Sequence, residues 1–269
     1  MYFSPFKHKN EPSTSNAESY SLSINSIIIK RVTQTKFLGV IIDDQLSWKP
    51  HLLSLNKKLR SSCGRIHRIA KCLPEVLHKQ IYHSLFESHL SFAISVWGGV
   101  SSNLLKPLFT TQKKCIRILF GDHESYEDKF KTCARVRPID KQRLGSKFYK
   151  KESTKPLFTK HKLLAVENLY KYRIVMEFFK IMKYRAPISI YNLFNRSARK
   201  DTYMITPSPS HQFTYKSVWL WNEFRKNIGS LDFSSSSYSM KNLLHKSLLN
   251  VQGRYGNDWC NVNFTGFCT

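Results

Sequence analysis

Residues 47–73 read SWKPHLLSLNKKLRSSCGRIHRIAKCL, a pattern that predicts one long helix with an apolar face and a basic face. Its apolar residues recur at spacings of three and four, and they are Leu52, Leu55, Leu59, Cys63, Ile66, Ala70 and Leu73. At about 100° per residue its basic residues fall on the opposite side, and they are Lys49, Lys57, Lys58, Arg60, Arg65, Arg68 and Lys71. No acidic residue lies between Gln45 and Pro74. A solvated face normally mixes charges of both signs, so this face is suited to lie along phosphate groups.

Two further helices are expected after Pro74, which ends the first one. The second covers residues 75–96 and stops at a Trp-Gly-Gly break. The third covers residues 104–120, in which apolar residues alternate with the basic residues Lys113, Lys114 and Arg117. Three helices with short connections predict a small bundle.

A smaller β-rich region precedes the long helix. Residues 27–29 and 37–42 are rich in Ile, Val and Phe, so we expect strands there, separated by the polar stretch KRVTQTK. Gly39 within the second strand indicates a bulge or a close approach by another backbone.

The predicted fold is therefore mainly α with a small N-terminal β element, a three-helix bundle and a further helical C-terminal region. The chain divides into residues 1–44, 45–121, 122–155 and 156–269. The third region is interpreted as a basic connector, because residues 129–151 hold nine Lys or Arg against one Asp. The last region is expected to contain helices over 166–184 and near 240–249, and a polar stretch at 197–217.

The charge of the whole chain points to a polyanionic partner. The 269 residues contain 43 Lys and Arg against 18 Asp and Glu, a formal net charge of +25. Such a charge attracts polyanions from a distance, with nucleic acid first and an anionic membrane surface second. No apolar run of membrane-spanning length occurs, and the first sixteen residues have no signal-peptide pattern. We expect an intracellular protein, nuclear or cytoplasmic and not secreted, with no membrane partner.

The six cysteines are interpreted as reduced thiols, because none forms a C-x-x-C pair. Cys260 and Cys268 have the position of a zinc knuckle but lack a nearby histidine ligand, since none follows His245. We therefore expect no metal site. The tryptophans are interpreted as core residues rather than as platforms for stacked bases; these are Trp48, Trp97, Trp219 and Trp221.

No catalytic site is recognisable in the sequence. A polymerase places an Asp-Asp pair after an apolar strand, where it holds Mg²⁺ with a third carboxylate from an earlier strand. Asp43 and Asp44 follow such a strand, but the acids before them, Glu11 and Glu18, lie in a polar loop. The pair is better interpreted as a turn that favours the start of the next helix. Hydrolase, zinc-protease and phosphate-loop motifs are absent, so no cofactor or small-molecule substrate is expected.

Six segments, in order, resemble the end of the reverse transcriptase region of jockey-like, LINE-type non-LTR retrotransposons. The first is TKFLGVIID at 35–43, followed by LSW at 46–48 and His51. The five later segments are SVWG at 95–98, the helix from Leu108 to Leu119 with its Gln-Lys-Lys, KPLF at 155–158, LYKY at 169–172, and Trp219 to Asn222.

The resemblance implies an RNA-directed DNA polymerase fragment that holds RNA, DNA or an RNA–DNA hybrid. Residues 1–44 would be the end of the palm, and 45–121 the thumb. Residues Lys36, Phe37, Leu38 and Gly39 would form the primer grip, which positions the primer 3′ end. The fingers, most of the palm with its Asp-Asp motif, and the endonuclease domain have no counterpart, so we expect a truncated product, inactive alone. Mg²⁺ would belong only to the complete enzyme.

Three alternatives remain open from the sequence. The first is a free-standing basic nucleic-acid-binding protein derived from such an element. The second is a truncated product without function, and the third is an enzyme of another class, such as a nuclease. The missing carboxylate cluster argues against the nuclease. The first two share every residue with the polymerase-fragment interpretation, so only measurement separates them.

Overall fold

A computed structural model of the chain describes residues 22–29, 32–70, 72–121, 153–197, 202–205, 212–228 and 233–254. Lys71, most of the basic connector, and the cysteines at 133, 260 and 268 lie outside the described residues. Within the described residues, no helix is long and apolar enough to cross a membrane.

The chain is mainly helical with a small N-terminal β element, which confirms the predicted fold class. The strands are β1 (Leu22–Ile24), β2 (Ile27–Ile29), β3 (Gln34–Phe37), β4 (Val40–Asp43), β5 (Phe194–Ser197) and β6 (Thr202–Ile205). The helices are α1 (Lys49–Ala70), α2 (His78–Ile81), α3 (Ser88–Ser91), α4 (Ile94–Trp97), α5 (Ser102–Phe120), α8 (Lys155–Lys160), α9 (Val166–Tyr184), α10 (Ile188–Tyr191), α11 (Gln212–Ile228) and α12 (Ser237–Arg254).

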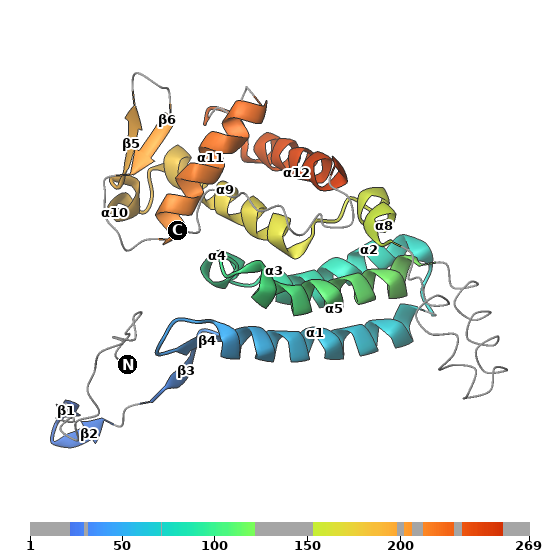
Figure 1. Ribbon diagram of the computed structural model, residues 1–269, viewed down its shortest axis with the longest axis horizontal. Helices are drawn as coiled ribbons and strands as arrows, with labels where there is room; N and C mark the ends of the chain where they lie inside the picture. The colour runs from blue at the N-terminus through green and yellow to red at the C-terminus, as the bar shows by residue number, and fades with distance from the viewer. Residues whose placement is uncertain are drawn as a thin grey trace.

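The helices form three layers (Figure 1). Helix α1 lies on one side, helices α2 to α5 form the middle layer, and α9, α11 and α12 form the other side. Helix α5 packs against α1 and also against α8 and α9, so one continuous apolar core runs through all three layers. The predicted three-helix bundle is thus present, and the C-terminal helices cover its other face.

Helix α1 has the apolar face that the sequence predicts. Its apolar positions from Leu52 to Ala70 are buried, whereas Leu73 lies beyond the end of the helix and is half-buried. Two polar residues in the same interface satisfy each other, because the Thr111 hydroxyl of α5 donates to Asn56 Oδ1 at 2.8 Å. Burying a polar pair costs little when its hydrogen bond is made.

The second predicted helix, over residues 75–96, is wrong as a single helix. It is a 3₁₀ turn (Glu75–Leu77), α2, a π-helical turn (Tyr82–Glu87), α3 and α4. Ala93 breaks it with a left-handed φ of 50°, and Trp97 Nε1 donates to the Phe92 carbonyl across the break at 2.9 Å. The extra residue of a π turn shifts which side chains face inward, and here Tyr82 and Phe86 are fully buried.

The predicted strand over 37–42 is interrupted by a turn. Strands β3 and β4 pair antiparallel from Gln34 with Asp43 to Phe37 with Val40. Between the strands lie Leu38, with a φ of 46°, and Gly39, with a φ of 86°; two positive φ angles in succession are typical of a type I′ hairpin turn. The predicted close approach of another backbone at Gly39 is wrong: Gly39 lies in the turn, and a Cβ there would lie 3.3 Å from Cε1 of the Phe92 side chain.

The C-terminal region contains the predicted helix over Val166–Tyr184 as α9, and α12 is longer than predicted. Helix α11 and the β5–β6 hairpin were not predicted. Both depend on long-range contacts: Trp221 is fully buried and stacks on Phe233 at 4.5 Å between ring centroids. The Asn222 side chain bonds both the N–H and the carbonyl of Tyr203, at 3.1 and 2.9 Å.

Two buried glutamines hold the chain between α8 and α9. Gln112 of α5 donates through Nε2 to the Tyr82 hydroxyl and the Leu164 carbonyl, both at 2.8 Å. Its Oε1 accepts from the N–H of Val166 at 3.1 Å. These bonds join α5 to the π-helical turn at Tyr82 and to the first turn of α9.

Gln252 of α12 holds the same connection from the opposite side. Its Oε1 accepts from the N–H of Ala165 at 3.1 Å and from Asn168 Nδ2 at 3.0 Å. Its Nε2 donates to the Leu163 carbonyl at 3.2 Å. The first N–H groups of a helix have no hydrogen-bond partner within the helix. At the start of α9, the N–H groups of Ala165 and Val166 donate to the two glutamine side chains instead.

Replacing Gln112 with Ala should lower the free energy of unfolding by about 3 kcal/mol, because it leaves buried donors and acceptors without partners. Urea denaturation followed by circular dichroism measures the change. Gln80→Ala is the matched control, since Gln80 is exposed on α2. Equal stability of the two variants would contradict a structural role for the Gln112 bonds.

Candidate nucleic-acid interface

The outer face of α1 is a continuous basic surface, which we call the α1 basic face. The six described members of the predicted set are all exposed; they are Lys49, Lys57, Lys58, Arg60, Arg65 and Arg68. None forms an ion pair with a carboxylate of the described residues, and Arg65 donates instead to Ser62 Oγ at 3.0 Å. Their charges are therefore available to an external anion.

The α1 basic face has the dimensions of a duplex contact. The 22 residues of α1 extend about 33 Å at 1.5 Å per residue, close to one turn of double helix, roughly 34 Å. At about 100° per residue, Lys58 and Arg65 lie along one edge of the exposed half and Lys49 and Arg60 along the other. A rod of this length with cations across its width can follow phosphates of both strands.

The three predicted cations of α5 differ in their surroundings. Lys114 is exposed on α5. Lys113 instead lies over the Phe109 ring at 4.4 Å, and Phe109 contacts Phe158 of α8. Arg117 is half-buried one turn further along α5.

The β3–β4 turn presents apolar side chains to solvent. Phe37 is 61% exposed and Leu38 79% exposed, and Lys36 beside them is also exposed. Such exposure costs solubility, so a pair of large apolar side chains at a turn tip is typical of a contact surface.

The turn and the α1 basic face belong to one surface. The N–H of Ile41 donates to His51 Nδ1 of α1 at 3.3 Å. A small cavity of about 60 Å³ beneath the turn is lined by Gly39, His51, Lys58, His89 and Phe92, together with Ser54 and Leu55. Burial, and then the charge of Lys58, lower the pKa of His51. Gly39, one of the four predicted primer-grip residues, thus lines the same cavity as Lys58.

Asp43 holds the turn that leads into α1, as the sequence predicted. Its carboxylate is buried and accepts from the N–H of Ser47 at 2.9 Å and of Trp48 at 3.0 Å. Burial would raise the pKa of Asp43, but the bonds from Ser47 and Trp48 outweigh it and lower the pKa from 3.8. The described residues contain no group of three or more side chains able to hold a metal ion.

Asp43→Asn should reduce the free energy of unfolding by about 1–2 kcal/mol near neutral pH, as for loss of a helix cap. Because folding lowers the pKa of Asp43, its contribution is present above pH 3.8 and is lost as the pH falls below that value. Urea denaturation at about pH 7 and about pH 2.5 measures the difference between wild type and variant. That difference should shrink in acid, whereas Asp44→Asn should show little effect at either pH.

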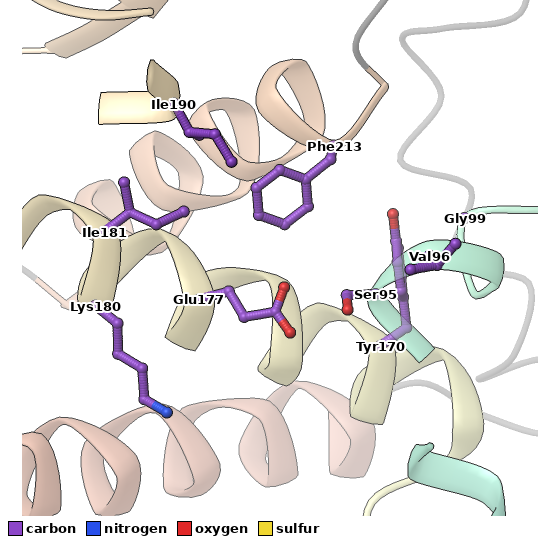
Figure 2. A pocket seen from close by; sticks show the side chains of 9 residues that line it. All are labelled: Ser95, Val96, Gly99, Tyr170, Glu177, Lys180, Ile181, Ile190 and Phe213. Atoms are coloured by element: carbon purple, nitrogen blue, oxygen red, sulfur yellow. The ribbon is translucent and has the colours of Figure 1, made fainter. Parts of the chain in front are cut away.

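A second cavity, which the sequence did not reveal, lies between the middle layer and the C-terminal helices. It measures about 510 Å³ and is lined from α4, α9, α10 and α11, with Gly99 after α4 completing it. Figure 2 shows the Glu177 carboxylate at its centre, with Phe213 and Ile190 on one side and Tyr170 on another. No signal in the sequence joins these residues, because they come from helices far apart in the chain.

Comparisons with known proteins found no matching family model, curated protein or solved structure. The geometry of the described residues therefore carries the functional argument.

Proposed function

We propose that the chain is the nucleic-acid-holding part of a reverse transcriptase like those of jockey-like, LINE-type non-LTR retrotransposons. The α1 basic face would lie along the template–primer duplex, and the β3–β4 turn would touch the primer end. The proposal assigns no catalytic residue and no metal ligand to this chain. The role corresponds to an intracellular protein, nuclear or cytoplasmic.

The α1 basic face is the observation that carries the proposal. Six exposed cations, none of them paired with a carboxylate in the part of the chain that the structure describes, lie along one 22-residue helix. Phosphate contacts of this kind hold a duplex in place without reading its sequence. A helix face that only contacts water normally carries both acidic and basic residues, whereas α1 has no acidic residue.

A free-standing basic binding protein derived from such an element would use the same face. This second candidate differs in its biological context and not in its residues. A product without function is the remaining alternative, and it predicts no ordered binding to duplex.

The first test is the salt dependence of binding to an RNA–DNA hybrid. The variant with Lys57, Lys58, Arg65 and Arg68 changed to Ala should flatten the slope of log affinity against log salt by about three to four, since each lost phosphate contact removes about 0.9. Fluorescence anisotropy across a salt series measures the slope.

The matched control changes four exposed lysines elsewhere, Lys79, Lys160, Lys241 and Lys246, to Ala. It removes the same charge and should leave the slope within about one unit of the wild type. If both variants flatten the slope equally, binding follows net charge and the α1 basic face has no special role.

Phe37→Ser should weaken binding to a hybrid with a recessed primer 3′ end more than binding to the same hybrid with blunt ends. Because Phe37 is 61% exposed, the stability of the fold should change by less than about 0.5 kcal/mol. Val76→Ser, at a position 85% exposed on the 3₁₀ turn, is the control. Equal losses on both duplexes would rule out a role for Phe37 at the primer end.

A further inference from the structure

We propose that the cavity around Glu177 holds one unpaired nucleobase that carries an amino group, taken from a strand held by the α1 basic face. The inference rests on the proposed function, because it supposes that a nucleic-acid strand reaches this end of the molecule. It adds a place where the protein distinguishes one base from another.

The lining of the cavity suits a flat, mostly apolar ring. Its volume of about 510 Å³ lies in the range of roughly 300–1,000 Å³ typical of ligand pockets. Val96, Ile181, Ile190 and Phe213 supply apolar walls, and Tyr170 adds a second aromatic ring (Figure 2). Stacking on aromatic rings is a common way for proteins to bind unpaired bases.

The rigid wall of the cavity is set by the close packing of α4 on α9. A Cβ on Gly98 would lie 2.6 Å from Tyr170 Cδ2, so only glycine permits this contact. Lys216 of α11 donates to the Gly99 carbonyl at 2.6 Å and lies 5.9 Å from the Tyr170 ring centroid. The ring of Tyr170 is thereby held between two elements.

The polar group at the centre is Glu177. Burial raises the pKa of Glu177, while a hydrogen bond with Ser95 and the charges of Arg173 and Lys180 oppose the rise. A carboxylate has about four acceptor sites, so the bond with Ser95 leaves room for further donors. The amino group of a base, and the ring N–H of guanine beside it, are such donors.

The charges around the cavity favour a nucleotide over a basic peptide. Lys180 lines the cavity, Arg173 is close enough to influence Glu177, and Lys216 lies against Tyr170. Two cations beside one carboxylate, with Lys216 against a wall of the cavity, repel a lysine or arginine side chain and attract a phosphodiester. A nucleotide fits both features, because its neutral base can enter the cavity beside the Glu177 carboxylate while its phosphates stay outside, near the cations.

Exposed apolar residues connect the cavity to the predicted duplex surface. Phe92, 53% exposed, lines the small cavity beneath the β3–β4 turn together with Lys58. Val96, 56% exposed and four positions later, lines the Glu177 cavity. The short segment from Phe92 to Val96 therefore links the lining of the small cavity beside Lys58 to the lining of the Glu177 cavity.

The test measures binding of single-stranded RNA 12-mers of uridine that carry one central guanosine, cytidine, adenosine or no substitution. The wild-type chain should bind the guanosine strand about tenfold more tightly than the all-uridine strand, as one well-placed base contact allows. Glu177→Gln should abolish this preference, because the amide replaces an acceptor by a donor, while all-uridine binding stays within about twofold.

Val96→Trp should also abolish the preference by filling the cavity from an exposed position, which leaves the core intact. Glu87→Gln is the matched carboxylate control, since Glu87 pairs with His83 at 2.9 Å away from the cavity lining. It should retain the wild-type preference. Thermal unfolding of each variant identifies any loss of fold.

The outcomes separate the two proposals. Salt-dependent binding with equal affinity for all four strands overturns the base pocket and leaves the α1 basic face as the binding surface. A preference that survives both Glu177→Gln and Val96→Trp also overturns the pocket, because another part of the chain then distinguishes the bases. Absence of salt-dependent binding to any strand or hybrid overturns both proposals.

Discussion

The fold depends on the hydrogen bonds of one buried side chain, Gln112. The amide of Gln112 is uncharged and carries two donor hydrogens and an acceptor oxygen. It can therefore donate to a hydroxyl and to a carbonyl while it accepts from a backbone N–H. Here it links Tyr82 of the middle layer with Leu164 and Val166 at the start of α9. Because an unpaired amide in the core is costly, these bonds favour one position of α9 against α5.

The segments that carry the resemblance to retrotransposon polymerases have structural roles in this chain. Gln112 belongs to the Gln-Lys-Lys helix, Gly98 packs on Tyr170 of the LYKY segment, and Phe158 of KPLF contacts Phe109. The Gly98–Tyr170 and Phe158–Phe109 contacts each join two separate segments of the resemblance, whereas the partners of Gln112 lie outside the segments. Part of the resemblance therefore corresponds to contacts within the core.

The sequence predicted the elements whose pattern is local. Helix α1 and helix α9 follow from repeated apolar spacing, and the role of Asp43 in the turn before α1 follows from its place between strand and helix. The break at Ala93 could not be predicted, since a left-handed alanine is stable only through contacts such as the Trp97–Phe92 bond. Helix α11 was missed for a related reason: its sequence is rich in polar residues, and burial of Trp221 decides its conformation. The Glu177 cavity draws on several helices, so no local pattern marks it.

The shared core has a consequence for how the chain can be divided. Helix α5 turns one side toward α1 and another toward α8 and α9. A fragment ending at residue 121 would expose apolar side chains of α5, such as Phe109, to water, and a fragment beginning at residue 153 would expose Phe158. Such halves, produced separately, would be poorly soluble, whereas produced together they carry complementary surfaces for reassembly. Cleavage between them would leave the two parts associated rather than release two independent proteins.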